Sequence, residues 1–177
     1  MISVGEYRLT QDLLMKTILL MRHAKSSWKT PGQADHDRPL NDRGRRDAVR
    51  MAERLKLASR SPDEVICSTA RRARETWELM ETMWHEIPPL KHAKRLYLAS
   101  PTDILAVAAT ADSDAERLLL IGHNPGMENL IFRLAGIDEP VPTAAIACIE
   151  LPIDSWSAVR GISNGQLVEF WYPKDGA

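Results

Sequence analysis

Three short apolar runs, separated by longer amphipathic segments, constrain the fold of this 177-residue chain more than any other feature. The runs cover residues 17–22, 64–67 and 117–121, and each has the length of a buried strand. Between them, apolar residues recur at spacings of three and four, which is typical of amphipathic helices. Strands that alternate with helices favour a mostly parallel sheet. We therefore expect an α/β fold, a three-layer α/β/α sandwich around a mostly parallel central sheet.

Capping residues and prolines delimit the expected helices. Asn41 or Asp42 can cap the first helix, while Ser100 and Asn124 each precede a proline, the favoured order of cap and first helical residue. The polar residues 24–40 are expected to form a long, functional loop. The other expected elements are helices to about residue 58, over 69–84, to about 111 and to about 135, a short strand within 90–98, and strands over 145–151 and 166–172, the last one at a sheet edge.

Composition excludes several classes of function. The chain has 23 basic and 24 acidic residues and a net charge of −1, so we expect neither nucleic acid nor an anionic membrane as a partner. No apolar run approaches the roughly 20 residues that span a bilayer. Cys67 and Cys148 are the only cysteines and have no metal-binding spacing. We expect both to be reduced and buried, with no metal site and a cytoplasmic location.

The chain length indicates one domain. The N-terminus lacks the basic start and continuous apolar stretch of a signal peptide. We expect residues 1–15 to be an N-terminal extension and residues 16–177 to form the single domain. An ordinary N-terminal helix that packs on the domain is the alternative.

Two of the apolar runs end on a histidine. Arg22 and His23 close the first run, His123 closes the third, and Arg72 lies just after the second. Ligands of open α/β sheets bind beyond the carboxyl ends of the strands, so we expect these side chains to meet there. Neutral imidazole is a competent nucleophile toward phosphorus, and guanidinium groups suit phosphoryl oxygens. The pattern indicates phosphate chemistry with a histidine nucleophile.

The residues of this pattern have separate expected roles. A lone histidine is more often structural, but the arginine beside His23 has no reason to enter a core, which favours His23 as the nucleophile. Arg22 and Arg72 are expected to bind the phosphoryl oxygens. His123, near a predicted helix N-terminus, is expected to donate to the transferring group. Ser26 either adds a hydroxyl donor or is an ordinary loop serine.

The motifs resemble those of the histidine phosphatase superfamily, the phosphoglycerate mutase-like group. The superfamily hallmark is Arg-His-Gly, and it stands here as Arg-His-Ala at residues 22–24. Alanine at that place is typical of the small SixA-type phosphohistidine phosphatases. The stretches 21–28 and 37–45 also look like this branch.

The second arginine and second histidine of the superfamily have counterparts as well. Its Ser-Pro-x-x-Arg-Ala-x-x-Thr pattern stands at residues 68–76, with Thr69 in place of proline. The match selects Arg72 over the neighbouring arginines, Arg71 and Arg74. The second histidine of the family corresponds to His123. The resemblance extends over about residues 16–172.

The resemblance implies a phosphoglycerate mutase-like fold and a mechanism without metal or cofactor. His23 attacks phosphorus and becomes phosphorylated, and water then hydrolyses the phosphohistidine. Arg22, Arg72 and His123 hold the phosphoryl oxygens meanwhile.

One departure from the family bears on the substrate. Many members carry an acidic general acid between the second arginine and the second histidine, and no clear match occurs here. The candidates without a motif are Glu78, Glu81, Glu86 and Asp103. A sugar alkoxide needs a proton donor to leave, whereas a protonated imidazole leaves without one. The gap favours a phosphoramidate substrate and argues against a mutase.

Three hypotheses about function follow. The leading one is a phosphohistidine phosphatase that acts on a phosphorylated protein, such as a histidine phosphotransfer domain. The second is a phosphomonoesterase of the same superfamily that acts on a small phosphate ester. The third is a module that binds phosphorylated partners without turnover. Because little chain is left for a lid, we also expect an open, shallow site that admits a protein side chain.

Overall fold

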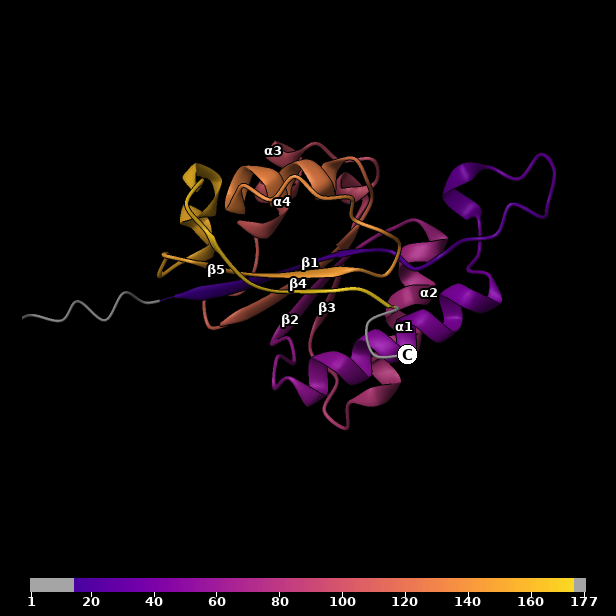
Figure 1. Ribbon diagram of the computed structural model, residues 1–177, viewed down its shortest axis with the longest axis horizontal. Helices are drawn as coiled ribbons and strands as arrows, with labels where there is room; N and C mark the ends of the chain where they lie inside the picture. The colour runs from indigo at the N-terminus through magenta and orange to yellow at the C-terminus, as the bar shows by residue number, and fades with distance from the viewer. Residues whose placement is uncertain (1–14, 174–177) are drawn as a thin grey trace, which may run out of the picture.

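A six-stranded sheet forms the middle layer of the computed structural model, which describes residues 15–173 (Figure 1). The predicted extension over residues 1–15 lies outside the described residues, except for Met15. The strands are β1 (Lys16–Arg22), β2 (Glu64–Ser68), β3 (Leu90–Ala93), β4 (Arg117–Gly122), β5 (Ile146–Leu151) and β6 (Gln166–Trp171).

The sheet has the order β3-β2-β4-β1-β5-β6. Strands β3, β2, β4 and β1 pair in parallel, whereas β5 runs antiparallel to β1, and β6 antiparallel to β5. The prediction of a mostly parallel sheet with β6 at an edge is therefore confirmed, and β1 lies inside the sheet. The run of apolar residues in β1 is explained by this position, because a central strand is covered on both faces.

Four helices cover the two faces of the sheet, α1 and α2 on one side and α3 and α4 on the other (Figure 1). They are α1 (Asp42–Leu57), α2 (Arg71–Met80), α3 (Pro101–Ala108) and α4 (Gly126–Ala135). Side chains of β1 alternate between the two layers, with Ile18 and Leu20 in the core under α3 and α4, and Leu19 and Met21 in the core under α1 and α2. The predicted three-layer sandwich is confirmed.

Helix ends follow the predicted caps in two cases and depart in two others. Asn41 accepts a hydrogen bond from the Gly44 N–H, and Ser100 forms a capping box at the start of α3. The predicted helix over 69–84 is shorter, because Ala70 stays extended and the last turn tightens to a 3₁₀ turn over Glu81–Met83. Asn124 is not a cap, because its Oδ1 accepts no hydrogen bond from the described residues, while its Nδ2 donates to the Val141 carbonyl.

The two cysteines lie as the sequence predicted. Cys67 and Cys148 are buried and free, as predicted. Within residues 15–173, no helix is both long and apolar enough to cross a membrane.

Candidate active site

An open cavity of about 220 Å³ lies at the carboxyl ends of β1, β2 and β4. The position is the one expected for a ligand site in a parallel sheet. The cavity is lined by Arg22, His23, Lys25, Ser26, Trp28, Asp35, Arg38, Arg72, Leu98, His123, Asn124 and Thr143. All five residues predicted as site residues are therefore in one place, although their roles remain predictions.

His23 is fixed by the backbone on both sides of β1. Its N–H donates to the Gly122 carbonyl at the end of β4, and its carbonyl accepts from the Ala144 N–H ahead of β5. The ring Nδ1 lies 2.7 Å from the Ala24 carbonyl oxygen, which can only accept. Nδ1 therefore carries the proton, and Nε2 presents its lone pair to the cavity.

The surroundings of His23 keep its ring neutral. Burial lowers the pKa of His23 from 6.5 to about 3. The bond to the Ala24 carbonyl opposes this shift, while the positive charges of Arg72 and Arg22 add to it. A neutral imidazole whose Nε2 carries no proton is the reactive form of a histidine nucleophile.

Arg72 is the centre of the polar contacts around Nε2 of His23. It is 4% exposed and lies in the first turn of α2. Its Nε donates to His23 Nε2 at 3.1 Å, and one terminal nitrogen lies 3.3 Å from His123 Nδ1. Thr76, one turn later, donates to the Arg72 carbonyl and accepts from the Ala24 N–H, so it ties α2 to the segment after His23.

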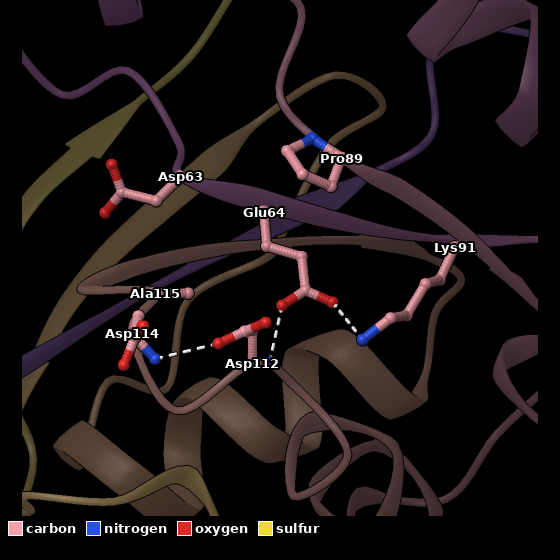
Figure 2. A pocket seen from close by; sticks show the side chains of 7 residues that line it. All are labelled: Asp63, Glu64, Pro89, Lys91, Asp112, Asp114 and Ala115. Atoms are coloured by element: carbon pink, nitrogen blue, oxygen red, sulfur yellow. Dashed lines mark hydrogen bonds and ion pairs between the residues drawn. The ribbon is translucent and has the colours of Figure 1, made fainter.

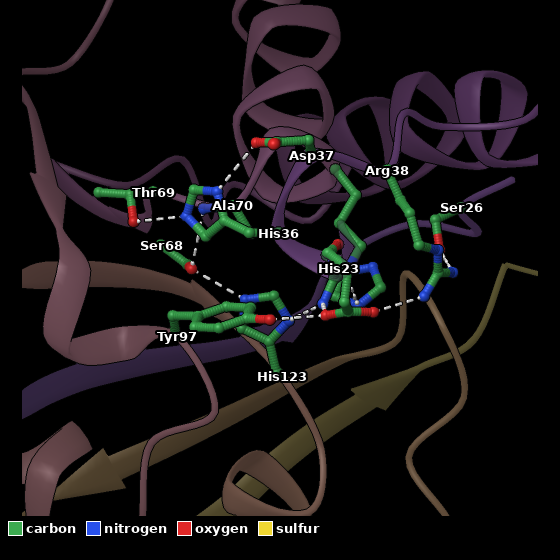
Figure 3. A network of polar contacts seen from close by, with 12 residues as sticks. His23, Ser26, His36, Asp37, Arg38, Ser68, Thr69, Ala70, Tyr97 and His123 are labelled. Atoms are coloured by element: carbon green, nitrogen blue, oxygen red, sulfur yellow. Dashed lines mark hydrogen bonds and ion pairs between the residues drawn. The ribbon is translucent and has the colours of Figure 1, made fainter. Parts of the chain in front are cut away.

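His123 contacts the second strand end as well. Its Nε2 is 2.8 Å from the Ser68 hydroxyl, a contact visible in Figure 3. Burial lowers the pKa of His123 to about 3, and its proximity to His23 and Arg72 adds to the effect. Ser68 can donate or accept, so either tautomer of the His123 ring keeps this bond. With the proton on Nδ1, His123 can donate to an oxyanion beside Arg72.

Arg22 has a donor that no protein group uses. One terminal nitrogen donates to the Val141 carbonyl at 2.8 Å. Its Nε is buried and has no hydrogen-bond partner among the described residues. Because Arg22 lines the cavity, its guanidinium is placed to bind an anion there.

Asp35 is the site residue that sequence reasoning missed. Its carboxylate accepts from Arg72 at 2.9 Å, from Arg38 at 2.7 Å and from the Tyr97 hydroxyl at 2.7 Å. Partial burial would raise its pKa, but the bonds from Tyr97, Arg38 and Arg72 outweigh this and lower the pKa to about 2. Asp35 is therefore an ionised carboxylate in the cavity.

The sequence pointed to Asp35 and Arg38 more clearly than to Tyr97. Asp35 and Arg38 belong to residues 24–40, which the sequence indicated as a functional loop. Tyr97 lies within residues 90–98, for which the sequence indicated only a short strand, and no spacing relates it to Asp35. Their meeting depends on the loop conformations and so on tertiary structure.

Ser26 is placed in the cavity wall but is engaged with the protein. It is 5% exposed, and its hydroxyl accepts a bond from Arg38. Arg38 is held further by the Ser27 carbonyl at 3.0 Å. Ser26 thus positions Arg38, while its own hydroxyl proton stays free to donate.

The candidate general acids of the sequence do not reach the cavity. Glu78, Glu81, Glu86 and Asp103 are absent from its lining. Asp103 is committed to the cap of α3 and to Arg95. Among the residues that line the cavity, Asp35 is the one carboxylate.

A second cavity, of about 290 Å³, lies at the opposite edge of the sheet, beside the amino ends of β2, β3 and β4 (Figure 2). Its acidic groups are occupied by the protein. Glu64 pairs with Lys91 at 2.6 Å and accepts from the Asp112 N–H, and Asp63 accepts from two backbone N–H groups. Within the described residues 15–173, no three His, Cys, Asp or Glu side chains are grouped as a metal site requires.

Sequence comparison finds relatives over most of the chain. The family profile described as "Histidine phosphatase superfamily (branch 1)" matches residues 18–96, which include Arg22, His23 and Arg72. An uncharacterized protein of Mycobacterium tuberculosis is 37% identical over 165 residues, which are 87% of this chain and 100% of that protein.

Solved structures with the same fold bear the name SixA. One, from Agrobacterium tumefaciens, has a TM-score of 0.76 at 27% identity, over 89% of this chain and 98% of that chain. Another, the protein histidine phosphatase SixA complexed with tungstate, has a TM-score of 0.74 at 22% identity, over 89% and 97%. These superpositions confirm the predicted phosphoglycerate mutase-like fold.

Proposed function

Because the chain belongs to the histidine phosphatase superfamily and is therefore a phosphatase, we propose that it hydrolyses phosphohistidine in a phosphorylated protein. The phosphoryl group passes through Nε2 of His23 as a covalent intermediate. The single observation that carries this proposal is the tautomer of His23. Nδ1 is bound to the Ala24 carbonyl, so the lone pair of Nε2 is directed at the guanidinium of Arg72.

In the first step, the phosphoryl group of the substrate enters beside Arg22, Arg72 and His123. A bond forms between His23 Nε2 and phosphorus while the bond from phosphorus to the substrate imidazole breaks. The substrate ring, protonated on its other nitrogen, takes the electron pair and leaves as neutral imidazole. Three donors that surround the equatorial oxygens stabilise the charge that develops on them.

In the second step, water attacks the phosphorus atom on His23. A phosphorus–oxygen bond forms, the bond to Nε2 breaks, and the electron pair returns to the neutral His23 ring. The proton of the water goes to the phosphate product. The bond from Nδ1 to the Ala24 carbonyl keeps the ring in one orientation through both steps.

Arg72 exchanges partners during this sequence. In the structure one terminal nitrogen of Arg72 donates to Asp35. The phosphoryl oxygens take this donor, and Asp35 keeps its bonds to Arg38 and Tyr97. Its carboxylate stays in the cavity as an acceptor for an N–H of the leaving imidazole.

The charge of Asp35 supports a phosphoramidate over an alcohol phosphate. With a pKa of about 2, its carboxyl is ionised at neutral pH and has no proton to give to an alkoxide. His23 and His123, with pKa values lowered to about 3, are also neutral at neutral pH. An imidazole leaving group needs no such proton, and relatives with this fold bear the names SixA and protein histidine phosphatase. The free, buried cysteines fit a reducing, cytoplasmic location.

The test traps the intermediate and compares substrates. The enzyme is mixed briefly with a ³²P-labelled phosphohistidine protein, quenched, and assayed for label that is lost in acid and kept in base. We expect the wild type to carry such label and His23→Ala to carry none. His92→Ala, which removes an exposed histidine on β3, is the matched control and is expected to behave as wild type.

A substrate panel then separates the two enzymatic hypotheses. We expect phosphohistidine to be preferred by orders of magnitude over sugar and serine phosphates. A preference for an alcohol phosphate would replace the proposal by the small-molecule phosphomonoesterase. Full activity of His23→Ala would refute the nucleophile, and tight binding without turnover would favour a binding module.

A further inference from the structure

Two large apolar side chains stand exposed at the mouth of the active-site cavity. Trp28 is 74% exposed and Leu98 is 61% exposed, and both line the cavity. The other large apolar side chains exposed within residues 15–173 are absent from its lining, and they are Met15, Leu57, Ile87, Leu90 and Phe132. Exposed large apolar groups that gather at a site indicate contact with another molecule.

Leu98 is held in this position against its backbone preference. Its φ is +51°, in the left-handed region that side chains other than glycine rarely adopt. The residues on either side fix it there. Tyr97 donates to Asp35 inside the cavity, and Ala99 is buried at 7% exposure. Backbone outliers of this kind cluster at ligand contacts, and here the outlier turns an apolar side chain outward beside a catalytic cavity.

Trp28 is also fixed before anything binds. The guanidinium carbon of Arg38 lies 3.1 Å from the centroid of the Trp28 ring. Arg38 is itself 7% exposed and bound to Asp35, Ser26 and the Ser27 carbonyl. The indole therefore rests on an anchored cation, and ordering it costs little on binding.

The charge at the mouth is positive. Lys25 is exposed and belongs to the same cavity lining, and Arg38 lies beneath Trp28. The one carboxylate of the lining, Asp35, is already matched by Arg38 and Arg72. The mouth of the cavity thus combines two fixed apolar side chains with an exposed cation, Lys25, that can pair with acidic residues of a partner.

We infer that Trp28 and Leu98, together with Lys25, are the docking surface for the protein that carries the phosphohistidine. The inference rests on the proposed function. In a protein substrate only one methylene group separates the imidazole from the backbone, so the surface around the phosphohistidine must reach the mouth of the cavity. The partner that fits presents its phosphohistidine from an apolar patch bordered by acidic residues. A small phosphate ester would cover much less of these two exposed side chains than the surface of a protein would.

The test compares a large and a small substrate that share one chemical step. Proteins phosphorylated on histidine with phosphoramidate serve as the large substrates, and free phosphohistidine is the small one. The variants are Trp28→Ala and Leu98→Asn, because asparagine tolerates the left-handed backbone that Leu98 adopts. Phe132→Ala is the control, since it removes an apolar side chain 55% exposed on α4, outside the cavity.

Wild type is expected to prefer at least one phosphorylated protein over free phosphohistidine. Trp28→Ala and Leu98→Asn are each expected to lower kcat/KM for that protein about tenfold or more, mainly by raising KM. A loss of this size is typical of a hot-spot residue at a protein interface. The value for free phosphohistidine should change much less, and Phe132→Ala should change neither.

Two outcomes would overturn the docking inference while the proposed function stands. One is an equal loss of kcat/KM toward the protein and toward free phosphohistidine in Trp28→Ala. This would mean that Trp28 only supports Arg38 inside the site. The other is a wild type that cleaves free phosphohistidine as efficiently as every protein tested. If wild type cleaves no phosphohistidine at all, the proposed function fails, and the docking inference falls with it.

Discussion

The lowered pKa of His23 predicts that its ring stays neutral in mild acid. The perturbation is a drop in pH from 7 to 5 in the enzyme without ligand. A histidine with the ordinary pKa of 6.5 would be only about 3% neutral at pH 5. Burial and the neighbouring arginines lower the pKa of His23 to about 3, so about 99% of the His23 rings are still neutral at pH 5. The difference is about 30-fold in the concentration of reactive imidazole.

The assay is ¹⁵N NMR of the histidine side chains, with His23 assigned by its loss in His23→Gln. This readout needs no substrate, whose own ionisation would distort a rate profile. We expect the Nδ1–H tautomer, imposed by the Ala24 carbonyl, to persist without titration between pH 7 and 5. A midpoint near 6.5, or a proton on Nε2, would refute the reasoning about both charge and geometry.

Three further predictions concern stability. A Cβ at residue 44 would lie 2.1 Å from the Lys25 carbonyl oxygen, so Gly44→Ala should lower the free energy of unfolding by about 1–3 kcal/mol or more. Urea titration measures this change, and Gly161→Ala, at a position with open space around it, is the control that should keep the stability of the wild type. Thr76→Val leaves a buried N–H without its acceptor and should cost about 1–3 kcal/mol, most of which Thr76→Ser should restore; an unchanged midpoint for the valine variant would contradict this. Because the pKa values of His23 and His123 are lowered to about 3 in the folded state, unfolding takes up protons below pH 6.5. Stability should therefore be full above pH 6.5 and fall toward pH 5 by up to about 1.4 kcal/mol per pH unit for each ring, and a flat profile between these values would count against both shifts.

The regular elements and the position of His23 were predictable because their signals are local. The apolar run over residues 17–22 is a strand wherever its neighbours lie, and its end at Arg22 and His23 places both at the carboxyl edge. The wrong predictions come from contacts between residues that are far apart in the sequence. Asn124 precedes a proline as a cap does, but the structure uses its amide for the Val141 carbonyl, a partner that the sequence cannot indicate.

The carboxylate of the site was out of reach for the same reason. The search for an acid considered residues 77–122, where relatives carry one, and found Glu78, Glu81, Glu86 and Asp103 without a motif. The structure supplies Asp35 from the loop that precedes α1, held by Tyr97, a residue 62 positions away. A loop without periodicity has no sequence signal for the direction of its side chains.

By itself, the sequence determined the layer architecture, the strand ends that carry Arg22, His23 and His123, and the choice of Arg72 through the family pattern. Tertiary structure alone decided the protonation of His23, the charge of Asp35 and the exposure of Trp28 and Leu98. The physical reason is range. Periodicity and capping act over a few residues, whereas a tautomer, a pKa or an exposed rim depends on groups that only the folded chain brings within a few ångströms.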